Sequence, residues 1–293
     1  MGLKIYMNGK MTDKEHAKIS VFDHGLLYGD GVFEGIRAYS GRVFRLRDHL
    51  ERLYDSARAI RLTIPMTIEE LEKAVIATLR INKLKDAYIR LVITRGNGDL
   101  GLDPDKCSEP SIIIITDKIK LYPEAYYKKG LEIVTVSTRK NSHDTLSPSI
   151  KSLNYLNNIL AKIEAKLCNA QEAIMLNKDG YVTECTGDNI FIIKNGELLT
   201  PPSYVGILNG ITRKTVMKLA VKKLAMTVKE ELFTQFHMYT ANECFLTGTG
   251  AEVIPVIRID DRIIGDGKPG KYTIKLITEF RKLTTSEGVE VFR

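Results

Sequence analysis

Lys151 is the residue of this chain whose setting best suits covalent chemistry. It stands in residues 149–158, at the expected start of a helix, beside a tyrosine and several small polar residues. Burial and neighbouring positive charge disfavour an ammonium ion, so a lysine held there can attack an aldehyde near neutral pH. The chain contains 43 lysines and arginines, most of which we expect on the solvated surface. The prediction of a covalent role for Lys151 therefore depends on other groups in the sequence.

Three later segments supply groups that complement an amine. Glu184 follows an expected β-hairpin, Ile211 and Thr212 open an expected helix, and Thr249 lies in a glycine-rich turn. Backbone N–H groups at a helix start or in such a turn bind phosphate. Each segment alone also fits an ordinary turn acid, helix cap or strand exit. Together with Lys151 they are the groups that pyridoxal phosphate requires, so we expect this cofactor.

The hydrophobic periodicity predicts mixed sheets and helices around these residues. Expected strands cover residues 35–39, 42–46, 87–94, 111–116, 131–137, 173–176, 190–193 and 244–246, and expected helices cover 46–60, 153–167, 211–224 and 271–282, with one more opening at a capping box at 67–70. We expect an α/β protein with a small N-terminal domain (1–120), a connector (121–130) and a larger cofactor-binding domain (131–293). Ligands belong in the cleft between two such domains.

Composition excludes several other classes of protein. The net charge is +7, but 43 basic and 36 acidic residues are mixed along all 293 positions, which argues against nucleic-acid binding. The four cysteines are far apart and lack a C-x-x-C pair, so we expect neither a disulfide framework nor a metal site. No apolar run approaches the roughly 18 residues of a membrane span, and no signal-peptide pattern opens the chain. We therefore expect a cytoplasmic protein that does not bind membranes.

The order and wording of the motifs resemble the fold-type IV pyridoxal phosphate enzymes, and most of all the branched-chain amino acid aminotransferases. The matching motifs are Gly-Val-Phe-Glu-Gly-Ile-Arg at 31–37, Ala-Tyr-Ile-Arg at 87–90, Ile-Lys-Ser-Leu-Asn-Tyr at 150–155, Thr-Glu at 183–184, Gly-Ile-Thr-Arg at 210–213 and Gly-Thr at 248–249. This resemblance covers nearly the whole chain. It implies amino-group transfer from leucine, isoleucine or valine to 2-oxoglutarate, giving 2-oxo acids and L-glutamate. It also implies self-association, as a homodimer at least, and allows a hexamer.

Carried over residue by residue, the resemblance makes Lys151 the Schiff-base lysine, Glu184 the partner of the ring nitrogen and Tyr155 the donor to the phenolate oxygen. The residues implied to hold the phosphate are Arg52, Ile211, Thr212 and Thr249. The residues implied to contact substrate are Tyr28, Phe33, Tyr88, Arg90, Leu102, Thr249 and Gly250. Of these, Arg90 and the 249–250 backbone would receive a carboxylate. Leu102 would cap an aliphatic pocket, and this pocket would belong to a neighbouring subunit if the site is shared across a dimer interface.

Several alternatives stay open at this stage. From its helix alone, Arg52 also fits a solvated face, and Arg45 or Arg47 are close enough to take its place. Cys185, Asp188 and Gly250 depart from the usual glycine, glutamate and alanine of the family, and Gly250 would widen the site. Other activities of the fold are D-amino acid aminotransferase and aminodeoxychorismate lyase, and a protein that binds a phosphate ligand without chemistry is a more distant alternative.

Overall fold

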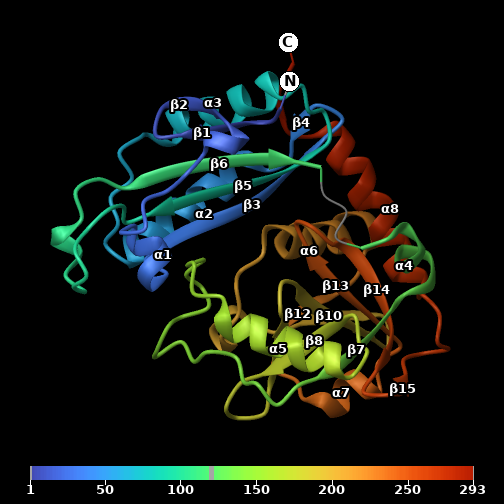
Figure 1. Cartoon of the computed structure of the whole chain (residues 1–293). Helices are drawn as coiled ribbons and strands as arrows, with labels where there is room; N and C mark the ends of the chain where they lie inside the picture. The colour runs from blue at the N-terminus through green and yellow to red at the C-terminus, as the bar shows by residue number, and fades with distance from the viewer. Residues whose placement is uncertain (1, 119–121, 293) are drawn as a thin grey trace. The chain divides into compact units, whose positions relative to one another are not determined.

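The computed structural model describes residues 2–118 and 122–292, which form two compact units (Figure 1). Unit 1 comprises Met1–Ile119, Ile150–Asn154 and Thr284–Arg293, and unit 2 comprises Lys120–Ser149 and Tyr155–Leu283. The boundary expected at residues 120/121 lies outside the described residues. Two segments expected in the C-terminal domain, including the one that carries Lys151, belong to unit 1, and the described part of the expected connector belongs to unit 2.

Unit 1 is built on an antiparallel sheet of seven strands among the described residues, in the order β16-β4-β3-β5-β6-β1-β2. The strands are β1 (Lys4–Met7), β2 (Lys10–Asp13), β3 (Gly31–Tyr39), β4 (Arg42–Val43), β5 (Ala87–Thr94), β6 (Ser111–Asp117) and β16 (Val289–Glu290). The helices are α1 (His24–Tyr28), α2 (Leu46–Ala59) and α3 (Ile68–Ile81), with 3-10 turns at Lys14–His16 and Pro104–Lys106.

The core of unit 1 lies between this sheet and helices α2 and α3. Alternate residues of β5, such as Ile89 and Leu91, are buried with Leu50 and Leu53 of α2. The predicted strand at 87–94 and the capping box of α3 are both confirmed. The strand expected at 42–46 is shorter, because α2 already begins at Leu46.

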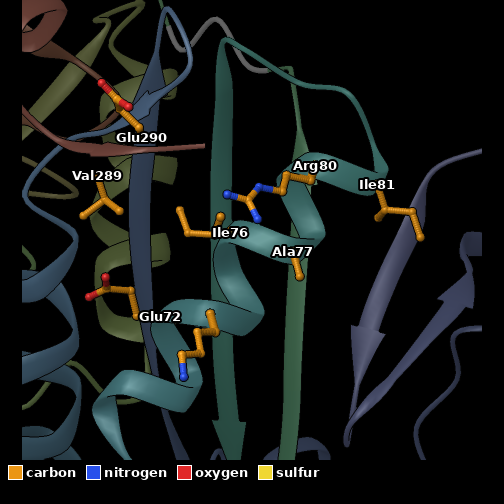
Figure 2. A pocket seen from close by; sticks show the side chains of 8 residues that line it. Glu72, Ile76, Ala77, Arg80, Ile81, Val289 and Glu290 are labelled. Atoms are coloured by element: carbon orange, nitrogen blue, oxygen red, sulfur yellow. The ribbon is translucent and has the colours of Figure 1, made fainter. Parts of the chain in front are cut away.

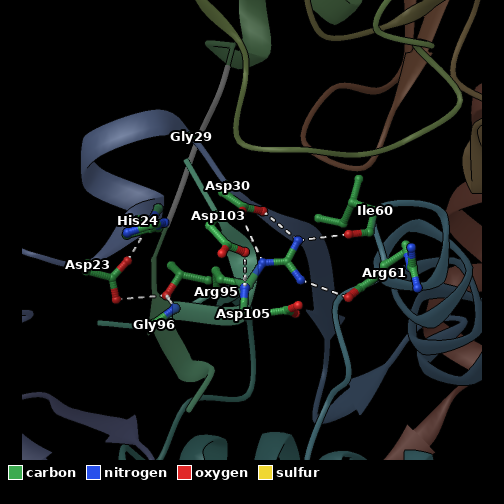
Figure 3. Close-up of polar contacts among 12 residues, drawn as sticks. Asp23, His24, Gly29, Asp30, Ile60, Arg61, Arg95, Gly96, Asp103 and Asp105 are labelled. Atoms are coloured by element: carbon green, nitrogen blue, oxygen red, sulfur yellow. Dashed lines mark hydrogen bonds and ion pairs between the residues drawn. The ribbon is translucent and has the colours of Figure 1, made fainter. Parts of the chain in front are cut away.

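Arg95 ties the end of α2 to the start of β3 (Figure 3). Its guanidinium donates to both carboxylate oxygens of Asp30, at 2.9 and 3.0 Å. It also donates to the main-chain carbonyls of Ile60 and Arg61, each at 2.8 Å. These four bonds fix the loop after α2 against the strand that carries Phe33.

The segment around Lys151 runs beside β3 instead of opening a helix. The Phe33 N–H donates to the carbonyl of Lys151, and Leu153 N–H donates to the carbonyl of Gly31, both at 2.9 Å. An antiparallel bridge joins Ser152 to Val32. The expectation that Lys151 lies at a helix mouth is therefore wrong, because main-chain pairing to β3 extends this segment and α5 starts only at Leu156.

Unit 2 contains a mixed sheet of nine strands among the described residues, in the order β12-β11-β10-β13-β14-β7-β8-β9, with β15 paired to β14. The strands are β7 (Leu131–Thr135), β8 (Glu172–Leu176), β9 (Val182–Cys185), β10 (Asn189–Lys194), β11 (Glu197–Thr200), β12 (Val228–Glu230), β13 (Glu243–Gly248), β14 (Glu252–Ile259) and β15 (Arg262–Ile263). The helices are α4 (Glu124–Lys129), α5 (Leu156–Leu167), α6 (Ile211–Leu224), α7 (Gln235–Tyr239) and α8 (Lys271–Ser286), with a 3-10 turn at Ser203–Val205.

Hairpins and stacked aromatics hold the centre of unit 2 together. The β10–β11 and β13–β14 pairs are antiparallel, whereas β7 is parallel to both β8 and β14. The rings of Phe191 and Phe245 stack at 4.9 Å on neighbouring strands. The mixed α/β architecture predicted from the sequence is confirmed.

Candidate active site

Two cations lie beside the ring of Phe33 in unit 1. The ammonium of Lys151 is 4.7 Å from the ring centre, and the guanidinium carbon of Arg90 is 4.6 Å from it. Arg90 also donates to the hydroxyl of Tyr88 at 3.4 Å, so the prediction that these two side chains share a face of their strand is confirmed. The aromatic ring stabilises each cation, and the pair of positive charges favours an anionic ligand here.

Gly35 gives the side chains on this face of the sheet room to meet. It lies directly opposite Arg90 in the pairing of β3 with β5. A Cβ atom at this position would collide with the hydroxyl of Tyr88. A glycine is therefore needed at position 35 of the 31–37 motif, because the hydroxyl of Tyr88 occupies the space that any other side chain at this position would take.

Arg52 projects from α2 onto a buried carboxylate. Its Nε and Nη2 donate to the two oxygens of Glu34 at 2.7 and 2.8 Å, and His49 Nδ1 lies 2.7 Å from the same carboxylate. Burial raises the pKa of Glu34, but the charges of Arg52 and His49 outweigh it and lower that pKa to about 2. Arg52 is only 15% exposed, so it does not lie on a solvated helix face. Sequence reasoning assigned no role to Glu34 or His49.

The two neighbouring arginines are engaged elsewhere. Arg45 pairs with Glu287 at 2.9 Å, and Arg47 pairs with Glu51 and Glu69 on the exposed side of the helices. Of the three arginines, Arg52 is thus the one that a buried carboxylate orients.

We expect Arg52→Ala to weaken binding of pyridoxal phosphate roughly 10- to 150-fold, because a charge-assisted bond to phosphate contributes about 1.5–3 kcal/mol. Turnover of protein saturated with cofactor should fall much less, since the phosphate is remote from the reacting atoms. Titration of cofactor-free protein, followed by absorbance, measures the dissociation constant. Arg47→Ala is the matched control. Arg52→Ala leaves the buried Glu34 carboxylate without its arginine partner, which can destabilise the fold. The double variant Arg52→Ala/Glu34→Gln removes that buried charge, so a loss of cofactor affinity in it reports phosphate binding and not unfolding. Unchanged cofactor affinity in both variants would contradict the assignment of Arg52 to the phosphate.

Glu184 is a buried carboxylate on β9 of unit 2. Its Oε1 lies 2.7 Å from Nζ of Lys140, and its Oε2 accepts from Asn189 Nδ2 and from the N–H of Leu208, both at 3.0 Å. Three donors therefore orient the carboxylate before any ligand is considered. Sequence reasoning identified Glu184 but missed Lys140 and Asn189. The asparagine directly before an expected strand was a usable signal, whereas Lys140 stands in a polar loop.

The start of α6 presents main-chain donors. Ile211 and Thr212 are buried in its first turn, where N–H groups have no partner within the helix, and no described side chain caps it. The Oγ1 of Thr247 is also buried without a hydrogen-bond partner among the described residues. Thr247 faces Asn189 across β13 and β10, so this unsatisfied hydroxyl lies beside the residue that orients Glu184. Together with Glu184, these donors match the ring nitrogen and phosphate of pyridoxal phosphate.

The remaining predicted residues are divided between the two units. In unit 1, Tyr28 ends α1 and donates from its hydroxyl to the carbonyl of Leu100 at 2.5 Å, while the side chain of Leu102 is exposed. In unit 2, Tyr155 directly precedes α5, and Thr249 and Gly250 form the turn between β13 and β14. These positions agree with the expected segments, and their roles toward a ligand stay predictions.

A surface pocket on unit 1 contains none of the predicted site residues. Figure 2 shows it between α3 and β16, where Ile76 and Val289 supply apolar contact and Arg80 and Glu290 supply charge. No helix among the described residues is both long enough and apolar enough to span a bilayer.

The amine beside Phe33 in unit 1 and, separately, the oriented carboxylate and the main-chain donors at the start of α6 in unit 2 are groups of the kinds that a pyridoxal phosphate enzyme requires. The amino-transferase class IV model matches residues 31–259, and the chain belongs to this family. More particularly, a Methanocaldococcus jannaschii protein is 53% identical over 99% of both chains. The Escherichia coli branched-chain amino acid aminotransferase structure is 36% identical, with a TM-score of 0.95 over 98% of this chain and 96% of that chain.

A third match is a branched-chain amino acid aminotransferase from a T.th. strain, which is also 36% identical over 97% of this chain and 95% of that chain. It has been solved with N-(5'-phosphopyridoxyl)-L-glutamate, at a TM-score of 0.91, and with 4-methylvaleric acid, at a TM-score of 0.92. One of these ligands carries a glutamate side chain and the other an aliphatic branch.

Proposed function

We infer that this chain transfers the amino group of branched-chain L-amino acids to 2-oxoglutarate with pyridoxal 5'-phosphate as cofactor. The observation that carries this inference is the pair of cations, Lys151 and Arg90, on the ring of Phe33. One cation is the amine that the chemistry requires, and the other is available to a carboxylate on an otherwise aromatic surface. The T.th. relative, solved with a glutamate adduct and with an aliphatic acid, supports one pocket for both side chains.

When bound, the cofactor withdraws electrons from the substrate Cα, and the residues of this chain hold it and move the proton. Lys151 would hold the aldehyde carbon of the cofactor and would carry the proton to and from Cα of the substrate. Glu184 would accept from the ring nitrogen, and Tyr155 would donate to the phenolate oxygen. The residues that would hold the phosphate are Arg52, Ile211, Thr212 and Thr249.

The substrate side has an apolar part and a carboxylate part. Phe33, Tyr88, Tyr28 and Leu102 provide contact for an aliphatic side chain, while Arg90 and the 249–250 backbone receive carboxylates. Leucine, isoleucine and valine differ by a methylene or a branch point, which is worth only about 1–3 kcal/mol in such a pocket. We therefore expect all three to be accepted, with efficiencies that differ by up to roughly 200-fold.

A substrate panel with 2-oxoglutarate tests the function. Purified protein should be yellow and lose its colour with borohydride, and glutamate should form from leucine, isoleucine and valine, at rates that differ by up to roughly 200-fold. D-Amino acids and 4-amino-4-deoxychorismate serve as competing substrates. Glutamate formation from D-alanine, or pyruvate release from aminodeoxychorismate, in preference to leucine would overturn the assignment.

We also propose that the enzyme is a homodimer at least, with a hexamer as the larger form. Helix α5 exposes an apolar stripe at helical spacing, consisting of Leu156, Ile159, Leu160, Ile163 and Leu167. An apolar stripe of this kind is typical of a protein interface. Sedimentation of Ile159→Glu beside the wild type tests its role. The four free cysteines support a reducing compartment, and we propose the cytoplasm.

A further inference from the structure

The strongest unassigned polar contact of the molecule is the buried pair of Lys140 and Glu184. Both side chains are more than nine-tenths buried, and their charged atoms lie 2.7 Å apart. Lys140 follows β7, and its N–H donates to the carbonyl of Leu176 at the end of β8, at 2.9 Å. Since β8 pairs with β9, which carries Glu184, main-chain hydrogen bonds set the distance between the two charged residues.

The loop that leads to Lys140 is itself anchored. The N–H and hydroxyl groups of Ser137 and Thr138 all donate to the carboxylate of Glu164 on α5. These hydrogen bonds lower the pKa of Glu164 to about 2. The position of Lys140 is thus fixed on both sides, by β8 and by α5, and does not depend on its flexible side chain alone.

The two oxygens of Glu184 are unequally occupied. Oε2 accepts two hydrogen bonds, from Asn189 and from the N–H of Leu208. Oε1 has Lys140 as its donor among the described residues. Because each carboxylate oxygen offers about two lone pairs, one acceptor position is left on Oε1. A single further N–H donor, such as a protonated ring nitrogen, would fill the remaining acceptor position of the carboxylate.

We propose that Lys140 is a positioning residue that stays paired with Glu184 when the cofactor binds, aims the open lone pair of Oε1 at the ring nitrogen and offsets the charge of the carboxylate. This inference rests on the proposed function, because it takes Glu184 as the partner of that nitrogen. Burial, followed by the charges of Glu172 and Asp188, raises the pKa of the thiol of Cys185, which is adjacent to Glu184 on β9. Lys140 is the cation in direct contact with Glu184 in the described chain.

The charge of the pair has a measurable consequence. Lys140 and Glu184 together carry no net charge. Removing the lysine charge and removing the carboxylate charge therefore change the electric field at the bound cofactor in opposite directions. Loss of the lysine leaves a negative charge, which stabilises the protonated form of the nitrogen that joins the cofactor to Lys151. Loss of the carboxylate charge leaves the lysine and has the reverse effect. One unit charge about 10 Å away shifts such a titration by roughly one pH unit.

The experiment is a pH titration of the visible absorbance of the cofactor-loaded enzyme. We expect the midpoint to rise by roughly one pH unit in Lys140→Met and Lys140→Gln, to stay near the wild-type value in Lys140→Arg, and to fall in Glu184→Gln. Lys140→Gln keeps a donor, so it provides the test if Lys140→Met does not fold. A purely structural lysine would change the melting temperature of these variants but leave the midpoint alone.

The outcomes separate this inference from the proposed function. If the wild-type protein binds no chromophore, the proposed function fails. If the wild type titrates and Glu184→Gln shifts its midpoint, while both neutral Lys140 variants keep the wild-type midpoint, only the role of Lys140 is overturned. A midpoint that moves in Lys140→Arg as far as in Lys140→Met would likewise overturn it, because the charge would then be irrelevant.

Discussion

Lys151→Ala abolishes transamination, with an expected loss of at least about 10⁴-fold, while the protein keeps its fold. The lysine supplies both the covalent attachment and the proton transfer at Cα, and proton transfer alone is worth up to about 10⁴. The main-chain carbonyl of Lys151 accepts from the N–H of Phe33 on β3, and alanine preserves this backbone hydrogen bond. Steady-state rates with leucine and 2-oxoglutarate measure the effect.

The control for this variant is Lys222→Ala on the exposed side of α6, which should retain wild-type turnover. Circular dichroism and the melting temperature establish that the Lys151 variant is folded. Activity within a few fold of the wild type would contradict the assignment of Lys151, whatever the substrate.

Arg90→Leu should damage the 2-oxoglutarate half-reaction far more than the leucine half-reaction. Only 2-oxoglutarate and glutamate bring a second carboxylate into the pocket, and loss of the cation from a buried pair costs about 3–5 kcal/mol, or roughly 10²- to 5 × 10³-fold. Leucine should lose little beyond orientation. Rapid-mixing measurements of each half-reaction separately, monitored by the cofactor absorbance, decide the point.

Arg42→Leu is a suitable control for this variant, because Arg42 lies in the same sheet and pairs with Glu290 on its edge. Neither half-reaction should change in it by more than about fivefold, since a surface ion pair contributes about 1 kcal/mol or less. Equal losses in both half-reactions of Arg90→Leu would mean that Arg90 binds the α-carboxylate or supports Phe33 and Tyr88.

Local patterns in the sequence predicted most elements of the fold. The alternation of β5 and the capping box of α3 depend on neighbours within a few residues, and both are confirmed. Lys151 was placed wrongly at a helix start because its real partner, β3, lies far earlier in the chain. Periodicity carries no information about such a distant main-chain pairing.

In the candidate site too, local patterns predicted some residues, whereas contacts between distant segments determine others. Glu184 was predicted from the Thr-Glu motif and Arg52 from the family resemblance, but the residues that orient them were not predicted. Lys140 stands in a polar loop, where a lysine is usually solvated, and only the folded sheet brings it to Glu184. His49 precedes Arg52 by three positions and so shares its helix face. That spacing was a usable signal for a common acidic partner, which the structure identifies as Glu34.

The discontinuity of unit 1 has a consequence for the order in which the protein matures. Residues 2–118 are synthesised before the segments with which they pair, because their sheet includes β16 (Val289–Glu290) and β3 pairs with the segment around Ser152. Contacts between such distant segments form late, because the entropic cost of closing a long loop must be met before the contacts contribute to stability. Lys151 therefore docks beside β3 only after the first part of unit 2, Lys120–Ser149, has been made. A nascent chain stalled before that point would hold its N-terminal strands without a reactive amine beside them.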